Sequence, residues 1–367
     1  MGHARSYDLV MTEPLNASQA SGASGAGAPW RPRLPLRAML GAKPISVADA
    51  RKAGVGRGAL SNKGLERPFY GVRQVPPQPP RASSQARGPS LDEFQVLRIR
   101  QRRRILAYVP RLRPGQAFGP RTTALLHGLP LPLRMLRDST VDVIVPQGAC
   151  RPNAAGVQAR GVPGRIFDVQ TVNGVPCAPP ELLYCLLARD LSEVDLLAVG
   201  DALITEADNY PNRTWFTALS SAEQLAAAVI RWSPGTGSAK LRKVTPMIRP
   251  GVESPYETSM RFHLHESGYP ELTLQLSIFH DGVELARADG ADLEARILYD
   301  FDGDGHRVDK RQFRKDVRRP RLLRMLGWHD ERLTVEDLEP SPDAFVKYAH
   351  ELRRRRLEEL ARQAPRA

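Results

Sequence analysis

The sequence predicts a multidomain α/β protein in which a small helical module, a mixed α/β region and an α-β-β-β-α-β domain follow one another. The first observation is the length of 367 residues, because single hydrophobic cores seldom grow so large. The second is a pair of stretches with little to bury: a Ser/Ala/Gly-rich tail at 1–30, expected to be disordered, and a Pro-rich linker at 78–89. The third is the different order of helix and strand patterns in the segments 31–77, 90–248 and 249–367, which we take as the folded parts.

The charge balance favours a polyanionic partner. The chain carries 53 Lys and Arg against 40 Asp and Glu, which gives a net charge of +13. Nucleic acid is the simplest such partner, because each neutralised phosphate releases counterions. The alternative is a generally Arg-rich proteome, and charge alone does not separate the two.

Cysteine spacing and hydropathy indicate a cytoplasmic protein. Cys150, Cys177 and Cys185 are odd in number and lack CxxC spacing, so neither a disulfide framework nor a zinc ribbon is expected. Residues 1–18 lack the apolar centre of a signal peptide, and no apolar run approaches the roughly 18 residues of a membrane helix. We therefore expect no membrane contact.

The segment 31–77 has the pattern of a winged helix-turn-helix. Its predicted elements are helices at 34–40, 47–53 and 56–62 and a small β-wing at 65–75. Ser46 is the expected cap of the second helix and Gly54 its stop, while Gly71 marks the bend of the wing.

In such a module a recognition helix and a wing contact DNA. Arg57, Asn62 and Lys63 belong to the predicted recognition helix, and Arg67 belongs to the wing. We favour DNA contact for these four residues over the alternative, a helical packing module whose basic residues are merely solvated.

The segment 90–248 offers less chemistry. A helix opens at a capping box (90–93) and runs through Leu106, and its arginines face either phosphate or, as we favour, solvent. These arginines are Arg98, Arg100, Arg102, Arg103 and Arg104. A helix at 121–127, strands at 141–145 and 166–172, and a helical stretch at 180–205 follow. His127, Asp195 and Asp201 lie here without a spacing that specifies chemistry, so structural roles are expected for them.

The segment 249–367 predicts the order helix, three strands, helix, strand and terminal helix. The expected ranges are 255–267, 271–278, 284–289, 295–301, 310–326, 332–335 and 342–362. The core of restriction nucleases uses the same α-β-β-β-α-β order.

Asp300, Asp302 and Asp304 end the third of these strands and can be interpreted in two ways. They match the opening of an EF-hand calcium loop, but the twelfth position is Arg311 instead of Glu and a strand precedes the loop, so we disfavour calcium. Alternatively, Asp300 acts with Asp289, which ends the preceding strand. Two strand-end carboxylates can hold Mg²⁺, which takes one or two carboxylates plus waters and substrate phosphate. Asp302 and Asp304 are then turn residues.

Several motifs in this segment resemble one known group. The motifs are Ser254-Pro-Tyr-Glu257, Arg287-Ala-Asp289, Tyr299-Asp-Phe-Asp-Gly303, His306-Arg307, Gln312 to Asp316, Arg319 and Gly327-Trp328. In this order they resemble the very short patch repair (Vsr)-like endonuclease domain of unknown function, a branch of the PD-(D/E)xK superfamily abundant in actinobacteria. Residues 121–132 resemble the AbiEi-type antitoxin region found upstream of such domains.

The resemblance implies roles at matching positions. Asp289 and Asp300 correspond to metal-binding carboxylates, and Glu257 to the acidic residue that completes or flanks the metal site. His306 corresponds to a general acid/base or water-orienting group. Arg307, Asp316 and Arg319 would support the site or hold phosphate.

Each implied role has a structural alternative. Glu257 also fits a capping box begun by Ser254, and Asp316 and Arg319 fit an intrahelical ion pair. Two departures are also present: Asp300 stands where the group has Glu, and Asp302 stands where the superfamily has Lys.

The sequence thus leads to two hypotheses. The first is a DNA-binding protein with a Mg²⁺-dependent endonuclease domain. The second is a non-catalytic regulator of the AbiEi antitoxin type that uses the nuclease-like fold to grip DNA, with a nucleotidyltransferase-like toxin as its partner.

Overall fold

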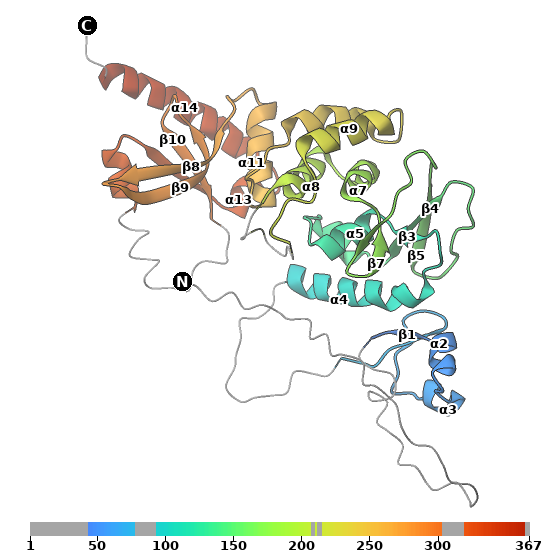
Figure 1. The fold of residues 1–367 in the computed structure, drawn as a ribbon. Coiled ribbons are helices and arrows are strands. Elements are labelled where there is room, and N and C mark those ends of the chain that lie inside the picture. Colours follow the sequence, from blue (N-terminus) through green and yellow to red (C-terminus); the bar gives the residue numbers. More distant parts are fainter. Residues whose placement is uncertain (1–42, 78–92, 207–209, 211–214, 303–318, 364–367) are drawn as a thin grey trace, which may run out of the picture.

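The computed structural model describes residues 43–77, 93–206, 210, 215–302 and 319–363. Within these residues the fold is mixed α/β and contains three separate sheets (Figure 1). The predicted helix at 34–40 and the linker at 78–89 lie outside the described residues. None of the described helices is both long and apolar enough to cross a bilayer.

The first module contains β1 (Ile45–Ser46), α2 (Val47–Lys52), α3 (Arg57–Leu60) and β2 (Val72–Arg73). Ser46 caps α2 as predicted, since its Oγ accepts from the Asp49 N–H at 2.9 Å. β1 and β2 pair antiparallel, and an isolated bridge joins Glu66 to Gln74. The predicted wing is therefore a small paired turn, in which Gly71 has a φ of +75°.

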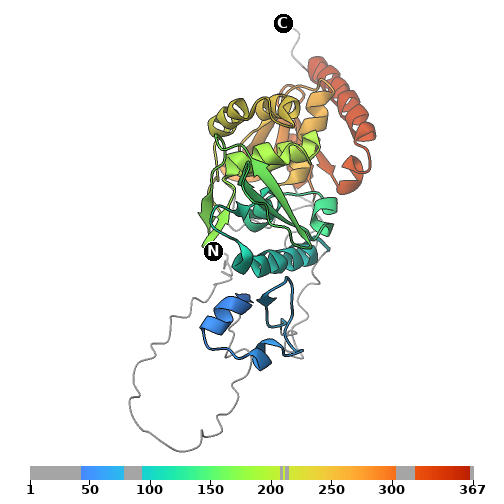
Figure 2. The ribbon, with the colours of Figure 1, turned by 90° about the vertical axis from the view of Figure 1, so that its right-hand side faces the viewer.

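This module rests on the long helix α4 (Glu93–Tyr108). Figures 1 and 2 both show α4 between the module and the middle region. Phe69 packs edge-on against Tyr108 with 5.0 Å between ring centroids, and the Arg103 guanidinium pairs with Glu66. The module's own apolar cluster is small, so we infer that these contacts contribute much of its anchoring.

The middle region is built on a five-stranded sheet of order β5-β4-β3-β7-β6. Its strands are β3 (Ala117–Phe118), β4 (Val141–Pro146), β5 (Val157–Val162), β6 (Gln170–Val172) and β7 (Val175–Cys177). The predicted strand at 166–172 begins only at Gln170, because the N–H groups of Ile166 and Phe167 donate instead to the Pro163 carbonyl in a turn.

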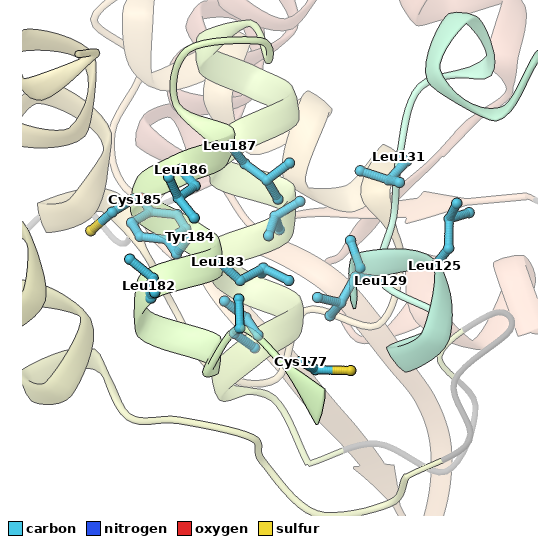
Figure 3. Close-up of a cluster of buried hydrophobic side chains, with 14 of the residues drawn as sticks. Leu125, Leu129, Leu131, Cys177, Leu182, Leu183, Tyr184, Cys185, Leu186 and Leu187 are labelled. Carbon is cyan, nitrogen blue, oxygen red and sulfur yellow. The ribbon is translucent and has the colours of Figure 1, made fainter. Parts of the chain in front are cut away.

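Helices cover this sheet and form the largest core. They are α5 (Pro120–His127), α6 (Leu133–Arg137), α7 (Pro180–Leu187), α8 (Glu193–Ile204), α9 (Ala222–Trp232) and α10 (Ser238–Val244), with short 3₁₀ turns η1 (Val109–Arg111) and η2 (Thr245–Met247). Every residue of α5 is buried, and α7 is buried nearly throughout. Figure 3 shows Leu183 of α7 and Leu129, after α5, pointing toward each other in this core.

The C-terminal part follows the predicted helix and strand order apart from one added short helix, and of the predicted helix at 310–326 only the residues from 319 on are described. It contains α11 (Pro255–Glu266), β8 (Thr273–His280), β9 (Val283–Asp292), β10 (Ile297–Phe301), helical residues 319–325, β11 (His329–Leu333), α13 (Val335–Leu338) and α14 (Asp343–Gln363). The sheet order is β11-β10-β9-β8, with β10 and β11 parallel and the other pairs antiparallel. β11 starts three residues before the predicted 332–335, and the short helix α13 was not predicted.

One strand of this sheet serves two cores. Leu274 of β8 packs in the cluster that includes residues of α11 and α14, as does Leu272 just before the strand, whereas Leu276 and Ile278 pack in the cluster that includes Leu323. A regular strand keeps residues two apart on one face. The change of face occurs at Gln275, whose φ of +52° lies in the left-handed region.

Candidate functional site

The two carboxylates predicted to end neighbouring strands lie next to each other, but β9 continues to Asp292, so Asp289 is an interior residue of its strand and does not end it. β9 and β10 pair antiparallel with Gly290 opposite Tyr299, so Asp289 and Asp300 form the next cross-strand position. The Asp289 N–H donates to Asp300 Oδ1 at 3.3 Å, and the Phe301 N–H donates to Asp289 Oδ2 at 2.8 Å. The strand pairing thus fixes both carboxylates at the position where the β9–β10 ladder ends.

Glu257 reaches the same place from α11. Ser254 caps α11, and its Oγ accepts from the Glu257 N–H at 3.2 Å. The Glu257 side chain does not complete the capping box, because its Oε2 accepts instead from the Glu253 N–H at 2.9 Å and from Gln275 Nε2 at 3.3 Å. A capping role therefore explains the backbone of Glu257 but not its buried carboxylate, which is 8% exposed.

Burial and mutual repulsion disfavour ionisation of these carboxylates. Burial raises the pKa of Glu257, and the nearby Asp289 raises it further. The pKa of Asp289 is raised mainly by burial, against the opposing effect of the Phe301 N–H. Burial raises the pKa of Asp300 to about 6, although Arg319 lowers it. The site thus contains several buried carboxylates close together. A bound cation would stabilise their ionised forms.

Two arginines neutralise part of this charge. Arg319 forms an ion pair with Asp300 and lies 3.6 Å from Asp330 of β11. Arg287 pairs with Glu253 at 3.0 Å. Arg319, to which the resemblance gives a supporting or phosphate-holding role, lies beside the predicted metal-binding carboxylates.

The available ligand atoms are oxygens, the atom type that a hard divalent cation prefers. Glu257 and Asp289 supply carboxylate oxygens, and the Gln275 Oε1 atom is buried with no hydrogen-bond partner among the described residues. Asp300 fits less well, because Arg319 already holds one of its oxygens. No group of three or more His, Cys, Asp or Glu within the described part of the chain is arranged to hold a metal ion. A cation bound here would thus depend on water and substrate oxygens, as Mg²⁺ commonly does.

Three predicted site residues, His306, Arg307 and Asp316, lie outside the described residues. So does Asp304, whereas Asp302 is described and its N–H donates to the Leu333 carbonyl at 2.7 Å. The roles of His306, Arg307 and Asp316 stay predictions.

The four predicted DNA-contact residues are all exposed on the first module. Asn62 Oδ1 accepts from the Gly64 N–H at 2.7 Å, and Arg67 donates to the Ser61 carbonyl at 3.3 Å. Arg57 presents its charge to solvent from α3, but the predicted recognition helix at 56–62 spans only Arg57–Leu60, so Asn62 and the exposed Lys63 lie in the turn that follows it. The surface is therefore basic and accessible, in agreement with either solvation or phosphate contact.

The α4 arginines are mostly engaged within the protein. Arg98 donates to the Leu129 carbonyl at 3.0 Å and Arg104 to the Ser139 carbonyl at 2.6 Å, while Arg103 pairs with Glu66. The prediction of a solvated face is thus wrong for these three side chains, which connect elements of the fold.

The predicted structural residues of the middle region do have structural contacts. Asp201 is fully buried and accepts hydrogen bonds from Thr258 and Arg261 of α11. Asp195 pairs with Arg134 at 3.1 Å. Burial lowers the pKa of His127 to about 4, and its ring lies 6.3 Å from that of Trp215.

Sequence reasoning missed the roles of Glu253, Gln275, Arg287 and Asp330. Gln275 alternates with Thr273 and Ser277 in the sequence, so it resembles a residue on a solvated strand face. Asp330 belongs to a stretch whose polarity was visible in the sequence but whose partner was not. Exposed Tyr70, beside the predicted wing bend, was also overlooked; its side chain is 91% exposed.

No family model matches the chain, and no curated protein or solved structure shows significant similarity to it. The resemblance to Vsr-like and AbiEi-type proteins therefore rests on the motifs in the sequence alone.

Proposed function

We propose that this chain is a DNA-binding protein whose C-terminal part is a Mg²⁺-dependent endonuclease. The observation that carries the proposal is the convergence of Glu257, Asp289 and Asp300 from a helix and two strands into one buried acidic cluster. Such a cluster is costly unless a cation or a reaction uses it, which is why perturbed carboxylates indicate functional sites.

The chemistry would be hydrolysis of a phosphodiester. Mg²⁺, when bound, would activate water and neutralise charge on the phosphate. Glu257 and Asp289 would hold the cation, and the N–H of Phe301 orients the Asp289 carboxylate toward a single geometry. Arg319 holds Asp300 in place and sits where it can also pair with a phosphate oxygen.

The exposed basic surface of the first module supports the DNA-binding half of the proposal. All four predicted DNA-contact residues are exposed: Arg57 on α3, and Asn62, Lys63 and Arg67 in the segment between α3 and β2. Contacts from such residues to phosphate would position the chain on DNA without specifying sequence.

Cleavage of supercoiled plasmid in the presence of Mg²⁺ tests the catalytic half. We expect the wild-type protein to cut and Asp289→Asn to lose about 10²-fold or more of the rate, because an amide cannot replace a metal-binding carboxylate. Asp281→Asn is the matched control, since Asp281 is a highly exposed carboxylate in the turn between β8 and β9. Equal cutting by wild type and Asp289→Asn would contradict the proposal.

The second candidate function is a non-catalytic DNA-binding regulator of the antitoxin type. It is favoured by Arg319, which already supplies a cation to Asp300 and Asp330. If the wild-type protein binds DNA with a steep salt dependence but does not cut it with Mg²⁺, this second function stands and the endonuclease fails. A nucleotidyltransferase-like toxin encoded beside the protein would then be its expected partner.

A further inference from the structure

Gln275 occupies an unusual backbone position beside the acidic cluster. Its φ of +52° lies in the left-handed region, which an unbranched but bulky side chain seldom adopts. Its neighbours Leu274 and Leu276 pair with Gly290 and Ala288, so the strand register places Gln275 opposite Asp289. The change of strand face alone requires a left-handed residue here, and Gly would provide it without strain.

The side chain of Gln275 makes a contact that Gly could not make. Gln275 Nε2 donates to Glu257 Oε2 at 3.3 Å, so the amide reaches from β8 to α11. Its Oε1 is buried and has no hydrogen-bond partner among the described residues. A buried amide oxygen left unpaired is destabilising unless another group satisfies it.

The surroundings of this amide are acidic. Glu257 and Asp289, the two carboxylates we assign to the cation, lie against it from α11 and β9. The loop before α11 is also close, since a Cβ on Gly251 would lie 3.6 Å from Gln275 Cγ. A cation at the two carboxylates would find Gln275 Oε1 as a neutral oxygen beside them, and Mg²⁺ prefers oxygen ligands.

We propose that Gln275 is a positioning residue of the metal site, whose Nε2 fixes the Glu257 carboxylate and whose Oε1 contacts the divalent cation or a water bound to it. This inference rests on the proposed endonuclease function. The left-handed backbone, the unpaired oxygen and the hydrogen bond to Glu257 would then all serve metal binding.

Binding of Mn²⁺, as a spectroscopic substitute for Mg²⁺, tests the inference without any catalytic assay. Titration of the full chain with Mn²⁺, followed by electron paramagnetic resonance, measures the affinity of wild type, Gln275→Met and Gln275→Gly. We expect both variants to bind Mn²⁺ about 10-fold or more weakly, as is typical when a residue that orients a metal ligand is removed. Gln275→Gly should nevertheless unfold at a temperature no lower than wild type in metal-free buffer, because it relieves the backbone strain.

Asp281→Gly is the matched control for the backbone. Asp281 has a φ of +50° in the exposed turn between β8 and β9, so this change relieves similar strain away from the cluster. It should leave Mn²⁺ affinity unchanged.

Three other results of the Mn²⁺ titration and the unfolding measurement would contradict either the inference or the proposed function. Wild-type affinity in Gln275→Met overturns the inference alone. A joint fall of affinity and thermal stability in Gln275→Gly also overturns it, because a structural role would then suffice. If the wild-type protein binds no Mn²⁺ or Mg²⁺, the proposed function fails and the inference falls with it.

Discussion

At the scale of single residues, buried ionisable groups make this molecule sensitive to pH. His127 is 2% exposed, and neither ring nitrogen has a hydrogen-bond partner among the described residues. Burial therefore favours the neutral imidazole and lowers the pKa to about 4. A group whose pKa is lower in the folded than in the unfolded state loses stability as pH falls. For His127 the relevant window runs from about pH 6.5, where the unfolded chain begins to bind the proton, down through about pH 4.

His127→Leu should reduce the loss of folding stability between about pH 6.5 and pH 4. Leu is similar in size and cannot be protonated, so the variant should match or exceed wild type near pH 7 and gain roughly 2 kcal/mol over it at pH 4.5. Urea unfolding across this pH range measures the difference. His280→Leu removes an imidazole that is not buried and serves as the control. Parallel pH profiles for wild type and His127→Leu would contradict the prediction.

At the scale of elements, the middle region and the C-terminal part meet through α8 and α11. Asp201 of α8 accepts from Arg261 at 2.6 Å and from Thr258 at 2.8 Å, and the Arg249 N–H donates to its other oxygen at 2.8 Å. Figure 1 shows α11 between the C-terminal sheet and α8. Because α11 also carries Glu257, this buried network helps to set where the acidic cluster forms.

Asp201→Ala should destabilise the protein by about 3–5 kcal/mol, since the Arg261 guanidinium would remain buried without its carboxylate. Chemical denaturation measures the loss. Asp195→Ala is the matched control on the same helix, because the Asp195–Arg134 pair is far more exposed and pairs of that kind contribute about 1 kcal/mol or less. Equal losses for the two variants would show that burial of the Asp201 network does not matter.

The elements also show how far the sequence predicts this structure. Ser46 and Ser254 predicted the starts of α2 and α11, because a helix cap is a signal within a few residues of sequence. Alternating or continuous apolar runs predicted β8, β9 and β10. β11 was placed too late because its residues are polar. Asp330 pairs with Arg319, and Glu331 accepts from Tyr348 at 2.9 Å, partners that are distant in sequence.

Within the candidate site, the strand pattern predicted Asp289 and Asp300, whereas Glu257 and Arg319 were expected only from the resemblance. Asp289 and Asp300 follow from two neighbouring strands, so their proximity could be expected from the sequence. Gln275 could not be found in this way, because its role depends on one backbone angle and on a bond to another element. The position of Arg319 over Asp300 likewise depends on the packing of a helix onto the sheet.

At the scale of the whole molecule, the net charge of +13 matters only where basic side chains lack acidic partners. On α14 many do have them: Arg354 and Arg355 both pair with Glu351 at 2.7 Å. Arg57 and Lys63, in contrast, are exposed on the first module. We therefore expect the first module to contribute more to DNA affinity than the Arg-rich last helix.

Two double variants of equal charge separate these surfaces. Arg57→Ala/Lys63→Ala should weaken DNA binding and lower the slope of log affinity against log salt by about 2, since each lost phosphate contact accounts for about 0.9. Arg354→Ala/Arg355→Ala should leave the slope nearly unchanged. Fluorescence anisotropy with duplex DNA at several salt concentrations measures both. Identical slopes for the two double variants would mean that net charge, and not the first module, governs binding.

The change of face in β8 has a consequence for how the C-terminal part unfolds. Its first half contributes Leu274 to one apolar cluster, and its second half contributes Leu276 and Ile278 to the cluster on the opposite side of the sheet. Because β8 packs in both clusters, we expect the strand to couple the two layers into one cooperative unit. The amides along β8 should then exchange with solvent at one common free energy of opening, although their side chains belong to separate cores.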